Sequence, residues 1–140
     1  MEKERPEAAV RYVKQEKVGE GSYGAVYKGC DRETGKTVVL KKMCGKGIAN
    51  TPGIDSHVLR EIALLKQLDH PNVVRLLDVL LDKERRVTLV FEHLDSDLKR
   101  LLVSSKTSLP LRLIQQYTYQ LLSAVAHCHS RGIFHRDIKP

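Results

Sequence analysis

The feature that most constrains the fold of this chain is a run of closely spaced glycines, Gly19-Glu20-Gly21-Ser22-Tyr23-Gly24. Glycine has no Cβ, so a backbone rich in it can closely approach a bulky, negatively charged ligand. A dinucleotide-binding turn with this spacing leads from a strand into a helix. Here residues 12–18 and 25–30 flank the glycines, and both segments predict strands. The pattern therefore predicts a hairpin whose tip can cover phosphate groups, with an ordinary hairpin as the alternative.

The composition is that of a globular domain and argues against several functions. The chain has 140 residues, of which 41% are hydrophobic and 29% charged, enough for one domain with a core. Its net charge of +7 is spread along a chain without tryptophan, so we expect no nucleic-acid partner. No apolar run approaches the roughly 18 residues of a membrane span, and we expect no membrane partner. The three cysteines fit neither a disulfide framework nor a zinc site, which favours the cytoplasm or the nucleus.

The order of the expected elements, five strands with one helix inserted after the third and then further helices, predicts an α+β fold. Short turns between consecutive strands favour antiparallel pairing. We expect Ser108 to cap the longest helix and Gly132 to end it. The expected strands cover residues 12–18, 25–30, 37–43, 73–81 and 87–91, and the expected helices cover 54–68, 96–103 and 110–131.

Two charged residues beyond the glycines bear on phosphate chemistry. Lys41 ends an apolar strand, from which its ammonium group could reach phosphates beneath the hairpin. Glu61, on the helix expected over residues 54–68, could supply the counter-charge that holds this lysine. Taken singly, Lys41 is more often a surface residue and Glu61 a solvated helix residue.

Two later segments complete the pattern. The strand that ends at Phe91 runs into a polar connector whose backbone groups could pair with an adenine edge, with Asp97 close to a ribose. In the run His135-Arg136-Asp137-Ile138-Lys139, Asp137 could accept a proton from a substrate hydroxyl and Lys139 could neutralise a transferred phosphate. An ordinary linker and a chance tripeptide are the alternatives.

In this order and spacing, the features resemble a eukaryotic protein kinase across almost the whole chain. The resemblance is strongest to the cyclin-dependent kinases, and Lys139 after Asp137 is similar to serine/threonine kinases. The segments that carry it, besides the glycine run, are Leu59-Arg60-Glu61-Ile62, His70-Pro71-Asn72-Val73-Val74, Leu89-Val90-Phe91-Glu92, Asp97-Leu98-Lys99 and the run from Gln120 to Ser130.

The resemblance implies a fold, a cofactor and a set of site residues. Residues 1–11 would be a lead-in, residues 12–94 a five-stranded antiparallel ATP-binding lobe with one inserted helix and a hinge, and residues 95–140 the beginning of a helical lobe. The implied cofactors are ATP and Mg²⁺. The implied catalytic residues are Lys41 paired with Glu61, Asp137 as the base, and Lys139. The implied ATP contacts are Val18, Gly19, Glu20, Gly21, Ser22, Tyr23, Gly24, Val26, Val39, Lys41, Phe91 as the gatekeeper, Glu92, His93, Leu94 and Asp97.

The implied reaction is transfer of the γ-phosphoryl group of Mg-ATP to serine or threonine residues of protein substrates. By the same resemblance, a cyclin-like partner is expected on the helix over residues 54–68, and phosphate on Ser22 or Tyr23 is expected to inhibit. The run Asp55-Ser56-His57-Val58-Leu59 differs from the usual family sequence, which predicts a partner other than the commonest cyclins. Val39 stands where the family usually has alanine, which predicts a tighter adenine pocket.

The metal-binding asparagine and the D-F-G aspartate of the family do not occur within the 140 residues, so we expect this chain to be inactive by itself. A metal site at His127-Cys128-His129 is not expected, because residues two apart on a helix face apart. We expect the apolar stripe of the longest helix to drive self-association. Two other functions stay open: a non-catalytic kinase-like module that binds a cyclin-like partner, and a dinucleotide-dependent enzyme, which would need a helix after Gly24.

Overall fold

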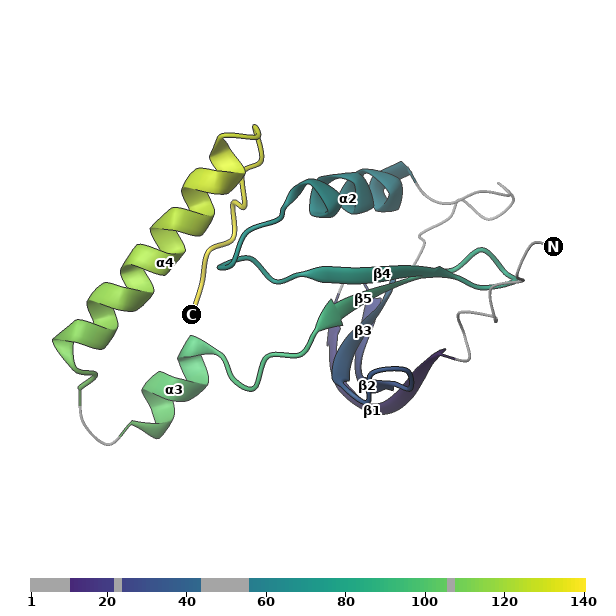
Figure 1. Cartoon of the computed structure of the whole chain (residues 1–140), viewed down its shortest axis with the longest axis horizontal. Helices are drawn as coiled ribbons and strands as arrows, with labels where there is room; N and C mark the ends of the chain where they lie inside the picture. The colour runs from purple at the N-terminus through teal and green to yellow at the C-terminus, as the bar shows by residue number, and fades with distance from the viewer. Residues whose placement is uncertain (1–10, 22–23, 44–55, 106–107) are drawn as a thin grey trace. The chain divides into compact units, whose positions relative to one another are not determined.

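A computed structural model describes residues 11–21, 24–43, 56–105 and 108–140 (Figure 1). The chain divides into two compact units. The first unit is formed by the residues up to Gln67 together with Arg75–His93, and the second by Leu68–Val74 together with Leu94–Pro140. The segment Leu68–Val74, which lies between the two parts of the first unit in the sequence, therefore belongs to the second unit.

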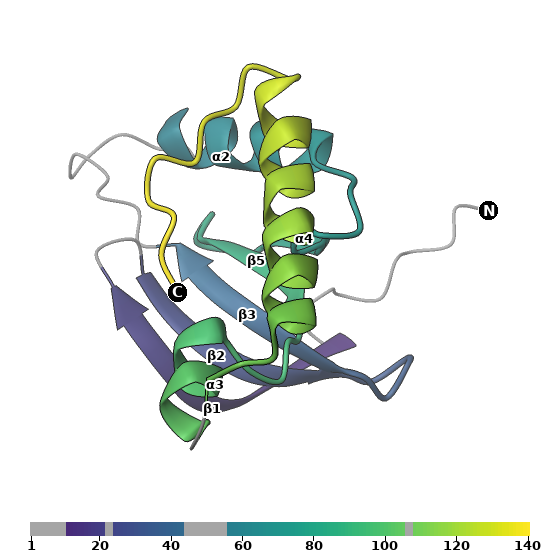
Figure 2. The same ribbon diagram turned by 90° about the vertical axis from the view of Figure 1, so that its left-hand side faces the viewer.

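The first unit is an antiparallel sheet with one helix. Helix α2 (Ser56–Gln67) follows the third strand in the sequence, and Figure 2 shows the first three strands side by side. Every neighbouring pair of strands is antiparallel. The predicted α+β fold with a five-stranded antiparallel sheet is thereby confirmed. In spatial order the strands are β1 (Tyr12–Gly21), β2 (Gly24–Asp31), β3 (Thr37–Met43), β5 (Val87–Glu92) and β4 (Leu76–Leu81).

The sheet buries apolar side chains on both faces, because alternate residues of a strand point to opposite sides. Helix α2 covers one of these faces, where Ile62 and Leu65 pack against the buried cluster that contains Val58, as the spacing i, i+4, i+7 of these residues predicts. Leu59, which the sequence predicts to widen this stripe, is exposed instead. The buried residues are Met43, Val87 and Leu89 with Val58 of α2 on the face that α2 covers, and Tyr12, Val38, Leu40 and Val90 on the opposite face.

Strands β1 and β2 form a strongly twisted hairpin. Strand β1 has register shifts on both sides of Lys17, and such bulges increase the local twist. At Gly29 the neighbouring backbone is so close that a Cβ would lie 2.8 Å from the carbonyl oxygen of Val13. Packing therefore requires a glycine at this position of β2.

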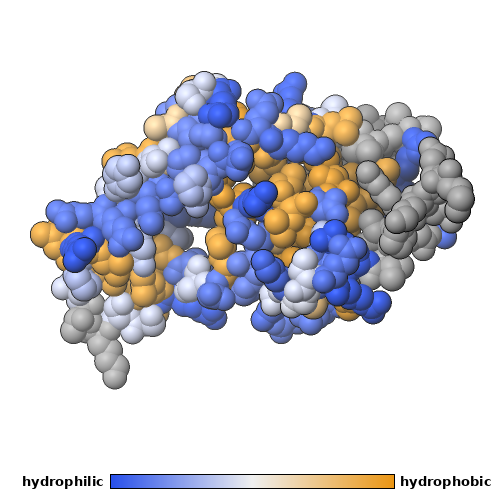
Figure 3. All heavy atoms as spheres, in the orientation of Figure 1, coloured by the Kyte–Doolittle hydropathy of each residue, from blue (hydrophilic) through white to orange (hydrophobic). Residues whose placement is uncertain are grey.

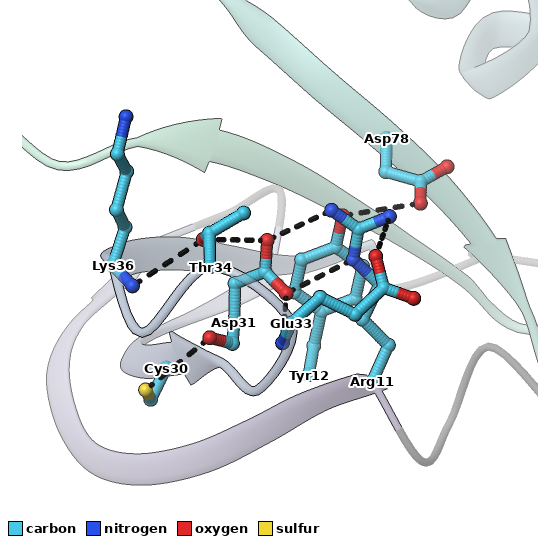
Figure 4. A network of polar contacts seen from close by, with 8 residues as sticks. All are labelled: Arg11, Tyr12, Cys30, Asp31, Glu33, Thr34, Lys36 and Asp78. Atoms are coloured by element: carbon cyan, nitrogen blue, oxygen red, sulfur yellow. Dashed lines mark hydrogen bonds and ion pairs between the residues drawn. The ribbon is translucent and has the colours of Figure 1, made fainter.

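A network of hydrogen bonds and ion pairs connects the residues at the base of this hairpin (Figure 4). Asp31 is buried, and its carboxylate oxygens accept hydrogen bonds from Nε and Nη2 of Arg11 at 2.9 and 2.8 Å. The hydroxyl of Thr34, in the β2–β3 turn, donates to the same carboxylate at 2.9 Å. The hydroxyl of Tyr12 donates to Asp78 Oδ2 at 3.2 Å and so joins β1 to β4, the two edge strands of the sheet. The hydrogen-bonded Arg11 holds the pKa of the Asp31 carboxyl well below its usual range.

The segment between α2 and β4 is a turn rather than the beginning of a strand. Strand β4 begins at Leu76, so the strand predicted over residues 73–81 is wrong for its first three residues. The amide of Val73 donates to the carbonyl of His70 at 3.0 Å and closes the turn. The two residues between them, Pro71 and Asn72, favour turns, and this preference outweighs the β-branched Val73 and Val74.

The second unit contains α3 (Leu98–Ser104) and α4 (Leu111–His129). Pro110 is the N-cap of α4 and makes no side-chain hydrogen bond, so the predicted cap at Ser108 is wrong. Beyond the helix, Gly132 has a φ of 69°, a left-handed conformation that favours glycine at the end of a helix. No helix in the described ranges is long and apolar enough to cross a membrane.

The helices of the second unit expose much of their apolar surface. Ile114, Tyr117 and Leu121 belong to the predicted stripe of α4, and each is more than a third exposed. Figure 3 shows apolar side chains gathered over α3 and the beginning of α4. The self-association expected of this stripe stays a prediction.

Candidate active site

Lys41 of β3 and Glu61 of α2 form an ion pair within the first unit. Lys41 Nζ lies 2.8 Å from Glu61 Oε1, and the two side chains are 26% and 33% exposed. Glu61 precedes Ile62, which packs on the sheet, so the packing of α2 sets the position of the carboxylate. The structure thus brings together the two residues that the sequence predicted to pair. A partly exposed pair contributes about 0–1 kcal/mol to stability, so it matters here for its position.

Four apolar side chains share the face of the sheet with Lys41. Residues directly opposite each other on neighbouring strands point to the same face. Val26 lies opposite Lys41 on β2, and Leu89 lies opposite it on β5. Val39 and Phe91 are opposite each other, two residues before Lys41 and two residues after Leu89, so they lie on the same face. Val26, Val39 and Phe91, which the resemblance implies to contact ATP, therefore lie on the same sheet face as Lys41.

Two glycines of the hairpin meet different structural requirements. Gly24 has a φ of 136°, which other residues rarely adopt. Gly19 lies opposite Val26 and has no such φ. A Cβ at Gly19 would lie 3.8 Å from Val26 Cβ, which is an ordinary contact. Nothing in the described part of the chain requires glycine at position 19, and the backbone there is accessible to the close approach of a ligand.

The other implied contacts of the hairpin receive less support. Val18 is exposed, and the carboxylate of Glu20 pairs with Lys17 beside it. Gly21 pairs with Gly24 at the tip. Ser22 and Tyr23 lie outside the described residues.

The end of β5 is tied to the residue that precedes β4. The amide of Glu92 donates to the carbonyl of Arg75 at 3.2 Å, and the amide of Arg75 donates to Glu92 Oε1 at 2.8 Å. The amide of Glu92 is therefore engaged within the sheet. His93 is the last residue of the first unit, and Leu94 is the first residue of the following segment of the second.

Asp97 has a structural role that the sequence pattern did not reveal. Its side chain accepts a hydrogen bond from the amide of Arg100 at 2.7 Å, so Asp97 is the N-cap of α3. The helix expected over residues 96–103 placed Asp97 inside the helix, whereas α3 begins at Leu98. The signal for the correct start is aspartate itself, one of the preferred N-cap residues.

In the second unit, Asp137 and Lys139 lie together in the irregular segment after α4. Lys139 Nζ donates to Asp137 Oδ2 at 3.0 Å, and the side chains are 72% and 74% exposed. The amide of Asp137 donates to His135 Nδ1 at 3.1 Å, and Arg136 has a left-handed φ of 61°. This turn presents a carboxylate and an ammonium group side by side to solvent, a pair suited to accepting a proton and neutralising a phosphate.

Residues 12–140 match the family model described as the protein kinase domain. The chain belongs to the protein kinase family. Protein kinases are transferases that use ATP and Mg²⁺ and act on protein substrates. The dinucleotide-dependent alternative is wrong, because strand β2 and not a helix follows the glycines.

This kinase domain contains a second cluster that resembles a nucleophile and its base. His70 Nε2 lies 3.2 Å from Ser123 Oγ. However, the amide of Asn72 donates to His70 Nδ1 at 3.1 Å, so a neutral His70 carries its proton on Nε2 and donates it to Ser123. A nitrogen that donates cannot accept the hydroxyl proton. The contact therefore anchors residues 68–74 to α4 and does not activate Ser123.

The described residues form no cluster of three or more metal-ligating side chains. In ranges 11–21, 24–43, 56–105 and 108–140, no three His, Cys, Asp or Glu side chains come together where they could hold a metal ion. The carboxylate of Asp137 has Lys139 as an ion-pair partner.

Proposed function

We propose that this kinase domain binds ATP and transfers the γ-phosphoryl group to serine or threonine hydroxyls of proteins. The observation that supports this most directly is the 2.8 Å pair of Lys41 and Glu61 on the sheet face that carries Val26. An ammonium group held beside an apolar surface suits a ligand that joins a planar base to phosphates. The serine/threonine type rests on Lys139, two residues after Asp137.

Catalysis of phosphoryl transfer depends mainly on positioning and charge stabilisation. In this proposal Lys41 neutralises charge on the α- and β-phosphates, and Glu61 holds the ammonium group in place. Asp137 accepts the proton of the attacking hydroxyl, and Lys139 neutralises the transferred phosphate. When bound, Mg²⁺ supplies further positive charge at the phosphates.

We further propose that the domain is of the cyclin-dependent type, with a cyclin-like partner on α2. Because α2 carries Glu61, a partner that moves this helix forms or breaks the pair with Lys41. Leu59 and Leu64 of α2 are exposed, whereas Val58 is buried against the sheet. A partner that favours the paired arrangement would activate the kinase by a population shift.

Calorimetric titration with ATP tests the nucleotide site. Loss of a hydrogen bond to a charged group costs about 1.5–3 kcal/mol, so Lys41→Ala should lower ATP affinity roughly ten- to hundredfold. Lys36→Ala removes an exposed lysine of the β2–β3 turn and is the matched control. Equal binding by Lys41→Ala and the parent would remove Lys41 from the site. Absence of ATP binding by the parent would favour the non-catalytic alternative.

A further inference from the structure

The side chain of Tyr12 crosses the face of the sheet opposite to α2. Tyr12 belongs to β1, an edge strand that pairs only with β2, yet its ring is buried in a cluster with Leu40 of β3 and Val90 of β5. Leu40 lies opposite Val90, and Val90 lies opposite Asp78 of β4, so these three side chains form a row on one face. The Tyr12 hydroxyl donates to Asp78 Oδ2 at the far end of this row, at 3.2 Å (Figure 4). The sheet is thus rolled, and one edge strand closes onto the other.

A glycine of β2 permits this close approach. A Cβ at Gly29 would lie 2.8 Å from the carbonyl oxygen of Val13, the residue after Tyr12, and 3.0 Å from Leu40 Cδ1. The base of β1 therefore lies directly against the core of the sheet. Burial, and then the charge of Asp78, raise the pKa of Tyr12 to about 12, so at neutral pH the hydroxyl keeps the proton that it donates.

The bond to Asp78 acts on the strand that carries the first glycines of the hairpin. Gly19 and Gly21 lie at the other end of β1 from Tyr12. Register shifts on both sides of Lys17 interrupt the pairing of β1 with β2, so this pairing constrains β1 less than a regular ladder would. The contact at Tyr12 adds a second attachment, to β4, which fixes the direction in which β1 runs toward the hairpin tip.

We propose that Tyr12 and Asp78 are positioning residues that hold the glycine hairpin over the phosphates of the nucleotide. This inference rests on the proposed ATP binding and extends it to two residues on the face of the sheet opposite to Lys41. Without their bond, the hairpin also populates arrangements in which its tip lies away from the phosphates. The apparent affinity then falls with the fraction of binding-competent molecules. One hydrogen bond shifts such an equilibrium roughly two- to tenfold.

The test compares ATP with adenosine, which lacks the phosphates, by calorimetric titration. Tyr12→Phe removes the hydroxyl and keeps the buried ring, and it should lower the affinity for ATP roughly two- to tenfold more than the affinity for adenosine. Asp78→Ala should have the same effect, and the double variant should add little, because either change already removes the bond. Asp78→Asn keeps an oxygen that accepts from the hydroxyl and should recover the ratio of the parent.

The ratio of the two affinities separates positioning from a general loss of structure. A loss of structure alone would weaken both ligands by the same factor, and an unchanged ratio in Tyr12→Phe would overturn the proposal. Tyr119→Phe removes the same hydroxyl from an exposed position of α4 and should keep the ratio of the parent. The Asp78 carboxylate also accepts from the amide of Val79 at 2.8 Å, so if Asp78→Ala does not fold, Tyr12→Phe and Asp78→Asn give the comparison. A parent that binds neither ligand fails the proposed function itself, a result distinct from an unchanged ratio.

Discussion

The two units of this kinase domain hold their charged site residues in different ways. In the first unit, Lys41 lies opposite the fully buried Leu89, and its partner Glu61 lies on a helix packed against the same cluster. In the second unit, Asp137 and Lys139 pair in an irregular segment where both are mostly exposed. Tertiary packing therefore sets the position of the first pair, and local chain geometry sets that of the second.

The difference follows from where apolar surface is buried. Among the described residues, every buried hydrophobic side chain except Ala124 belongs to the first unit. A sheet that buries both faces fixes its side chains, because protein interiors are close-packed. Helix α4 buries Ala124 alone among its residues, so it gives the segment after it little packed support.

Truncation of a core residue should produce the largest difference in stability between the two units. Leu89→Ala should lower the free energy of unfolding by about 2–5 kcal/mol, since it leaves a cavity in a closed cluster. The matched change Leu122→Ala, at an exposed position of α4, should change it by less than about 0.5 kcal/mol. Denaturant unfolding followed by circular dichroism measures both. Equal losses would mean that the second unit has a comparable core.

Replacement of single glycines by alanine tests which glycines of the first unit the fold requires and which the nucleotide site requires. Gly19→Ala should lower ATP affinity roughly tenfold, equal to about 1.4 kcal/mol, because the added methyl occupies the surface that the ligand approaches. The same change should raise stability by up to about 1 kcal/mol, since alanine restricts the unfolded chain. Gly35→Ala is the control, for which we expect a loss of stability without a change in ATP affinity. With a φ of 68° and open space around it, Gly35 should cost stability when replaced and leave ATP binding unchanged.

Acid titration tests the network at the base of the hairpin. Arg11 lowers the pKa of Asp31 in the folded protein, so the unfolded chain takes up the proton first as the pH falls. The stability that Asp31 contributes is therefore present above its ordinary pKa of 3.8 and is lost below it. Asp31→Asn should be less stable than the parent at pH 7, and the difference should narrow below pH 4. A difference that is constant with pH would show that the charge is not responsible.

The smallest effect is expected at His127 in the second unit. Its ring lies 4.8 Å from that of His70, and its Nε2 is buried with no hydrogen-bond partner among the described residues. Desolvation, then the charges of Arg131 and His70, lower its pKa from the ordinary 6.5, and Asp69 opposes them. The unfolded chain then binds the proton more readily, so stability should fall as the pH decreases below about 6.5. His127→Phe should reduce this slope in thermal melts at pH 5 to 8, and an unchanged slope would contradict the assignment.

Most elements could be predicted because their signals are local. Enrichment in β-branched residues located β3, and the stripe of Val58, Ile62 and Leu65 located α2 within two residues of each end. The errors occur where two local preferences compete. Val73 is β-branched but follows a Pro-Asn turn, and Ser108 is a good cap but precedes a proline that takes the cap position itself.

The sequence by itself determined which chemical groups are present and in what order. It placed a lysine at the end of an apolar strand, a glutamate on the next helix, and an aspartate and a lysine after the longest helix. Only the tertiary structure decided which groups meet. The contacts Lys41–Glu61, Arg75–Glu92 and Tyr12–Asp78 join residues 20, 17 and 66 positions apart. Such contacts depend on strand register, on the coiling of the sheet and on the packing of α2. These features result from the simultaneous burial of many side chains, and no local sequence pattern encodes them.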